Sequence, residues 1–124
     1  NVKTTHGERL TKQRNTFAEL VKKYKPTDFA KEAGFARHMK ATQVLYKAYG
    51  VTEEFFSKEG IADYPATTIK KTITGNGNAE KQSVEFFVRD RLKLEDDFKF
   101  VSDDESDAMA VALTHLIKTG GISE

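Results

Sequence analysis

The segment Ser102–Leu116 constrains the fold of this chain most, because it predicts a helix together with the point where that helix begins. Ser102 followed by Glu105 has the form of a capping box, in which two side chains bind free N–H groups at a helix N-terminus. Apolar residues then recur at helical spacing, namely Ala108, Val111, Ala112 and Leu116. Gly120 and Gly121 predict the end of the helix. We therefore expect a helix whose apolar stripe faces the core.

The first turn of this predicted helix is strongly acidic, with Asp103, Asp104, Glu105 and Asp107. The helix dipole favours acids here by about 0.3–1 kcal/mol each, which explains one or two of them. Four carboxylates repel one another, so we expect a cation among them. Asp104 and Asp107 share a helix face, and paired carboxylates suit Mg²⁺ or Mn²⁺. A solvated acidic turn is the alternative interpretation.

Three segments carry a resemblance to RuvC-like Holliday-junction resolvases, which are nucleases of the RNase H-like superfamily. The acidic helix has the pattern Asp-x-x-Asp-Ala-x-Ala-x-Ala-x-Thr-His over residues 104–115. Residues 28–35 resemble the family's strand with the second carboxylate, which has an aromatic residue three positions later. Residues 70–81 resemble its Lys-x-x-(hydrophobic)-x-Gly-x-Gly-x-Ala-x-Lys segment. Because the three segments agree in type, order and spacing, they are more specific than any single motif.

The resemblance implies a fold, an activity and a set of site residues. The fold is a single α/β domain over residues 1–124, an RNase H-like mixed sheet flanked by helices. The activity is metal-dependent cleavage of four-way or branched DNA junctions by a homodimer. Glu32, Asp104 and Asp107, with a further upstream Asp, would hold two Mg²⁺ ions per site, Mn²⁺ being the alternative. The DNA-binding residues would be Phe35, Arg37, Lys40, Lys70, Lys71 and Lys81.

The same resemblance implies that the family's N-terminal strands are missing from the sequence. RNase H-like nucleases carry their first carboxylate on a central strand near the start of the domain, whereas no Asp precedes Asp28 here. We expect an upstream hairpin of about 30 residues that supplies this carboxylate. Without it, the sheet would have two unpaired edges and cleavage would be largely lost. The alternatives are that another chain or a rearranged strand fills the gap.

The distribution of charge is uneven although the net charge is only +1. Residues 1–50 carry 11 Lys and Arg against 4 acids, residues 51–100 carry 8 against 10, and residues 101–124 carry 1 against 5. A basic first half with an acidic last helix suits an anionic polymer on one surface and cations at one point. The alternative is that these charges only solvate the surface.

The remaining patterns predict the other elements. We expect helices over residues 7–24, 37–60 with one interruption, and 78–92, the last with Asn78 as N-cap. A strand is expected over residues 28–33, and a short strand or an extended turn over residues 61–65. Residues 1–5 are expected to form the end of another strand, and residues 94–101 read as a linker. Buried side chains are expected to include Val84, Phe87, Val88, Leu92, Phe98 and Phe100. Gly50 within a helix suggests close approach of a second helix, consistent with a dimer.

Composition limits the remaining possibilities. The chain has no Cys, which excludes disulfides and thiolate metal sites. No apolar segment is long enough to span a membrane, so we expect a cytoplasmic protein of a bacterium or of a phage-infected host cell. A non-catalytic module that binds branched DNA is the alternative function. A helical interaction protein that binds neither DNA nor metal is a third hypothesis.

Overall fold

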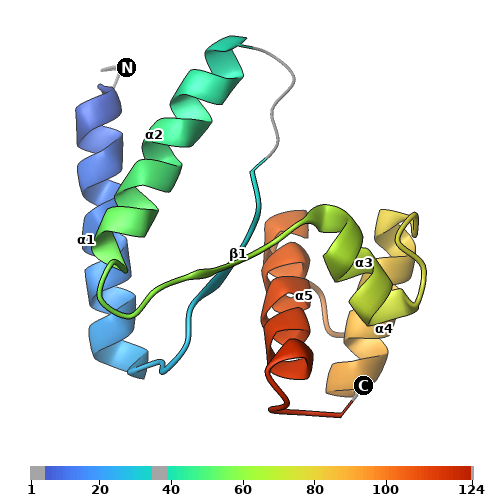
Figure 1. Cartoon of the computed structure of the whole chain (residues 1–124). Coiled ribbons are helices and arrows are strands. Elements are labelled where there is room, and N and C mark those ends of the chain that lie inside the picture. Colours follow the sequence, from blue (N-terminus) through green and yellow to red (C-terminus); the bar gives the residue numbers. More distant parts are fainter. Residues whose placement is uncertain (1–4, 35–38, 124) are drawn as a thin grey trace. The chain divides into compact units, whose positions relative to one another are not determined.

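The computed structural model describes residues 5–34 and 39–123, and for residues 39–42 it describes the backbone alone. Its elements in chain order are α1 (His6–Tyr24), β1 (Ala30–Glu32), α2 (Met39–Phe55), β2 (Ala62–Tyr64), α3 (Ala66–Thr74), α4 (Lys81–Leu92) and α5 (Asp103–Lys118) (Figure 1). They form two compact units. The first contains α1 and α2, and the second contains both strands with α3, α4 and α5. The expectation of a single domain stays a prediction.

The first unit is a pair of helices held by aromatic packing. The Phe17 ring of α1 lies 5.6 Å from the Phe55 ring and 5.2 Å from the Phe56 ring, measured between centroids. The Gln13 amide donates hydrogen bonds to the Ala48 carbonyl and the Thr52 hydroxyl, at 3.0 and 2.8 Å. None of the 19 described residues of α1 is buried. The two helices are therefore joined by these polar and aromatic contacts of half-buried α1 side chains.

The ends of α1 follow from local sequence chemistry. The Thr5 hydroxyl accepts a hydrogen bond from the Glu8 N–H at 3.1 Å, which caps the first turn. Lys25 adopts the left-handed conformation at φ 48° and precedes Pro26, which the helix cannot include. The predicted helix over residues 7–24 is thus confirmed. Residues 1–4 of the predicted N-terminal strand lie outside the described residues.

The second unit contains a short parallel pair of strands. Ala30, Lys31 and Glu32 of β1 align with Ala62, Asp63 and Tyr64 of β2. Lys31 forms an ion pair with Asp63 across the pair, and the Ala33 N–H donates to the Tyr64 carbonyl at 2.8 Å. Both predicted strands are therefore present, and the sheet formed by the described residues is this parallel pair.

The core of the second unit lies where α3, α4 and α5 meet. Its buried members are Ile69, Ala79, Val84, Val88, Ala110, Val111 and Leu113. Val88 and Thr114 are both 0% exposed. The helix α3 was not anticipated from the sequence, because its Thr67-Thr68-Ile69 run is β-branched and disfavours helix. Gly75, in the left-handed conformation at φ 86°, ends it.

Of the four residues predicted to form the buried stripe of α5, three are not buried. Val111 is buried, but Ala108, Ala112 and Leu116 are exposed. The buried face instead includes two hydroxyl residues, Ser106 and Thr114. Their hydroxyls donate to the carbonyls of Asp103 and Ala110 at 2.9 and 2.8 Å, so burial leaves neither group unsatisfied.

Two other local predictions need correction. The N-cap of α4 is Glu80 rather than Asn78, because the Asn76 side chain accepts a hydrogen bond from the Asn78 N–H at 2.9 Å and extends the turn. In α5, Ser102 is the N-cap by position, but its side chain makes no cap hydrogen bond. Glu105 accepts from the Val101 N–H at 3.2 Å instead of completing the capping box.

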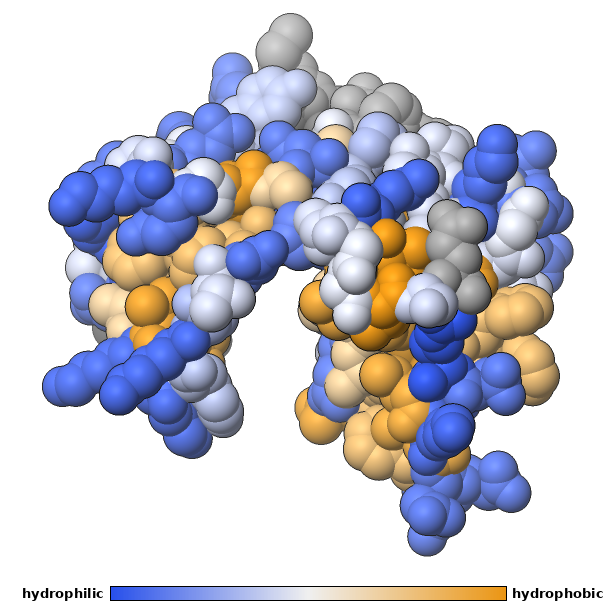
Figure 2. Space-filling view, turned by 60° about the horizontal axis from the view of Figure 1, so that its bottom comes forward, coloured by the Kyte–Doolittle hydropathy of each residue, from blue (hydrophilic) through white to orange (hydrophobic). Residues whose placement is uncertain are grey.

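Several large apolar side chains predicted to be buried are partly accessible. Phe87 and Leu92 are each 40% exposed, and Phe98 and Phe100 are half-buried. The Arg89 guanidinium lies 4.8 Å from the Phe100 ring centroid and donates to the Phe98 carbonyl, which orders this linker. Hydrophobic surface (orange) occurs on both units (Figure 2). Among the helices of the described residues, none has the length and hydropathy required to cross a membrane.

Candidate active site

Glu32 is placed by the end of β1. Side chains alternate between the two faces of a strand, so Glu32 shares a face with Ala30, which packs against the core of the second unit. Lys31 points to the opposite face and pairs with Asp63 there. The strand pairing therefore turns the Glu32 carboxylate toward the side on which α5 packs against β1.

One pocket of the second unit brings together predicted site residues from four elements. Its volume is about 230 Å³. Its charged lining comes from Glu32 at the end of β1, Lys70 of α3, Lys81 at the start of α4, and Asp107 of α5. Its apolar lining is Ala66, Ile69, Val84 and Ala110. Two carboxylates that are 75 positions apart in the sequence thus share one pocket with two lysines.

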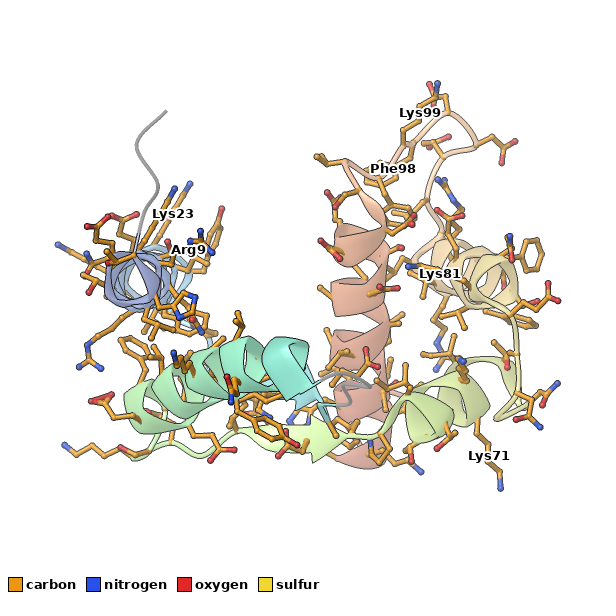
Figure 3. All side chains as sticks on the ribbon, turned by 90° about the horizontal axis from the view of Figure 1, so that it is seen from above. Arg9, Lys23, Lys71, Lys81, Phe98 and Lys99 are labelled. Carbon is orange, nitrogen blue, oxygen red and sulfur yellow. The ribbon has the colours of Figure 1, made fainter. Side chains whose placement is uncertain are left out.

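Lys81 crosses from α4 to the acidic turn of α5. Its Nζ lies 3.3 Å from Asp107 Oδ2 and 3.5 Å from Asp103 Oδ2. Figure 3 shows the Lys81 side chain extending from α4 toward α5. Hydrogen bonding to Asp107, together with the charges of Asp107 and Asp103, raises the pKa of Lys81 above its ordinary value of 10.5. The cation expected among the acids is therefore a lysine of the chain.

The other predicted residues of this unit occupy different positions. Asp104 is exposed and is not among the described residues that line the pocket. Lys70 is half-buried at the pocket wall, whereas Lys71 is exposed and points away from α4 and α5 (Figure 3). Lys70 and Lys81 therefore lie at the pocket, whereas Lys71 does not, although all three belong to the same sequence segment.

Three predicted DNA-binding residues have no described side chain. Phe35 and Arg37 lie outside the described residues, and Lys40 is described only by its backbone within α2. Gly34, which precedes them, lies so close to Tyr49 that a Cβ there would be 1.9 Å from the tyrosine ring. Glycine is therefore required at the start of this segment as the chain is folded.

The structure adds one residue that the sequence interpretation did not single out. Asp103 and Asp107 are four positions apart on α5, and both pair with Lys81. Spacing alone allows either Asp103 or Asp104 to share a face with Asp107, and the pattern of the resemblance favoured Asp104. The Nδ1 atom of His115 lies at hydrogen-bond distance, 2.7 Å, from the Tyr64 hydroxyl of β2.

Comparisons with known proteins identify the family. The family model described as "Crossover junction endodeoxyribonuclease RuvC" matches residues 1–115. The RuvC of Lawsonia intracellularis is 37% identical over 113 residues, which cover 89% of this chain and 66% of that protein. The RuvC of Idiomarina loihiensis is 33% identical over 126 residues, which cover 94% of this chain and 69% of that protein. The chain thus spans about two-thirds of the length of these relatives.

Solved structures agree with the predicted fold. A Thermus thermophilus RuvC structure matches with a TM-score of 0.78 at 26% identity, covering 96% of this chain and 76% of that one. The same organism's RuvC in complex with a Holliday junction substrate matches in fold with a TM-score of 0.83 at 24% identity, covering 94% and 71%. The RNase H-like expectation is confirmed by these matches. The chain belongs to the RuvC family of crossover junction endodeoxyribonucleases.

Proposed function

We propose that this chain forms most of a metal-dependent endodeoxyribonuclease that nicks four-way DNA junctions. The observation that carries the proposal is the shared pocket of Glu32 and Asp107, which come from β1 and α5. Acidic residues distant in sequence that converge beside lysines suit a reaction at a phosphodiester, where metal ions and cations offset negative charge. Family membership supplies the class of reaction and implies that it depends on a divalent metal.

The chemistry of the pocket fits Mg²⁺ or Mn²⁺. Glu32 and Asp107 offer carboxylate oxygens, which these ions prefer, and the Lys81 ammonium already stands as a cation beside Asp107. Within residues 5–34 and 39–123 no group of three or more His, Asp or Glu lies close enough to form a metal site. We assign Asp104 as a further ligand, because it occupies the first Asp of the family pattern. When bound, two divalent ions would activate water and stabilise the leaving oxygen.

The basic residues have a separate role in this proposal. Lys70 and Lys81 would contact the scissile region of the DNA, because both line the pocket that holds the carboxylates. Phe35, Arg37, Lys40 and Lys71 would supply further DNA contacts, with Phe35 stacking on an unpaired base near the junction centre. Such contacts predict binding that weakens as salt concentration rises.

The experiment compares binding with cleavage in the complete gene product. Glu32→Gln, Asp104→Asn and Asp107→Asn should each abolish nicking of a four-way junction in Mg²⁺, because each removes a charged oxygen ligand. Junction binding in a gel-shift assay should survive, since the DNA contacts come from other residues. Asp90→Asn makes the same chemical change in a different surface pocket and should leave nicking unchanged.

The alternative function gives a different result in the same assay. A non-catalytic module for branched DNA would prefer the junction over linear duplex in the gel shift, but the wild-type protein would not nick it in any divalent metal. A protein that binds neither junction nor duplex would contradict both functions.

A further inference from the structure

The Lys81 ammonium occupies a position that a metal ion would also favour. It is the first residue of α4, yet it reaches the start of α5 and pairs with Asp107 and Asp103 (Figure 3). It also lines the pocket that contains Glu32. The acidic turn therefore has a counterion from the chain itself, in the pocket where the proposed divalent ion binds.

The same carboxylate cannot serve both cations equally well. Asp107 Oδ2 lies 3.3 Å from Lys81 Nζ, so an ion coordinated by Asp107 would bring two positive charges close together. Repulsion between them favours movement of the lysine, which is flexible and 54% exposed. Asp103 provides a second anion four positions earlier on α5 that the lysine can keep.

We propose that Lys81 is the resident counterion of Asp107, that a divalent ion displaces it, and that Asp103 then holds the ammonium at the pocket edge. The inference depends on the proposed function only in taking Asp107 as a metal ligand. It makes Asp103 a positioning residue, which acts through Lys81. Metal binding thereby releases a cation next to the pocket, where a DNA phosphate takes the place of Asp107 as its partner.

The first test is the affinity for Mn²⁺ without DNA, measured by calorimetry on the complete gene product. Lys81→Met removes the competing charge and should bind Mn²⁺ roughly threefold more tightly than the wild type, a modest change because the ion pairs are partly exposed. Lys81→Arg keeps the charge and should resemble the wild type. Lys71→Met is the matched control, since Lys71 is exposed, is not among the residues that line the pocket, and points away from α4 and α5 (Figure 3).

The outcomes of this titration separate the inference from the proposed function. Tighter binding by Lys81→Met alone supports the displacement. Equal affinities of the wild type, Lys81→Met and Lys71→Met would overturn it and leave the metal site in place. Absence of Mn²⁺ binding in every variant would overturn both the inference and the proposed metal site.

A second measurement follows the lysine in the unmutated protein. Titration with Mg²⁺ should shift the NMR resonance of the Lys81 side-chain ammonium in step with saturation of the metal site, while that of Lys71 stays constant. A Lys81 resonance that does not move as the site fills would overturn the displacement, whatever the variants do.

The role of Asp103 is tested through the sign of its effect on DNA affinity. A simple charge argument predicts that Asp103→Asn binds DNA more tightly, because it removes a negative charge near the phosphates. Loss of the positioning contact predicts the reverse, weaker binding of a cleavage-resistant phosphorothioate junction in Mg²⁺. Tighter or unchanged binding by Asp103→Asn would refute the positioning role.

Discussion

Val88 is completely buried in the core shared by α3, α4 and α5, where it packs with residues of all three helices. A side chain in such a position stabilises the fold by removing its methyl groups from water and by filling space that no other group can fill. The pocket depends on this core, because Val84 and Ile69 belong to both.

The first prediction concerns Val88 itself. Val88→Ala should lower the free energy of unfolding by about 1–3 kcal/mol, since it deletes buried methyl groups and leaves a cavity. Val101→Ala makes the same change at a side chain that is 91% exposed, and should alter the stability by less than about 0.5 kcal/mol. Urea denaturation of both variants measures the difference, and equal effects would contradict the assigned core.

At the scale of elements, caps and turns decide where each functional side chain lies. Gly75 ends α3 in the left-handed conformation, and the turn that follows leads to Lys81 at the start of α4. Gly50, by contrast, lies inside α2, where a Cβ would meet no other atom within 4 Å. Glycine is therefore expected to stabilise the fold at position 75 and to destabilise α2 at position 50, relative to alanine.

A matched pair of variants tests this contrast. Gly75→Ala should cost roughly 1 kcal/mol because alanine is disfavoured at positive φ, although the space around it is open. Gly50→Ala should stabilise α2 by about 0.5–1 kcal/mol, because alanine has the higher helix propensity. Thermal unfolding of both variants measures whether each substitution lowers or raises the stability. Destabilisation by Gly50→Ala would instead indicate that another helix packs closely against this glycine.

Sequence patterns predicted most elements because their signals are local. Pro26 and the positive-φ Gly120 act within a few residues, so the ends of α1 and α5 could be predicted. The buried face of α5 could not, because Thr114 and Ser106 satisfy their hydroxyls within the helix and enter the core. Likewise, the pairing of Lys81 with Asp103 depends on how α4 packs against α5, which no local pattern specifies.

At the scale of the whole molecule, the proposed reaction favours a dimer. A four-way junction presents two equivalent strands, and a two-fold symmetric homodimer presents two equivalent pockets to them. Light scattering of the complete gene product at the concentrations used for cleavage should give twice the mass of one chain. Cleavage of both strands by a strictly monomeric protein would contradict this arrangement.

The proposed active site requires Glu32 and Asp107 to share one divalent ion, which diffraction tests most directly. Crystals soaked in Mn²⁺ and measured for anomalous scattering should show a peak within coordination distance of a carboxylate oxygen of each residue, about 2.0–2.2 Å for ions of this kind. In Asp107→Asn crystals that peak should weaken or disappear. A wild-type map with no peak in this pocket, or with Mn²⁺ bound by neither carboxylate, would contradict the proposed active site.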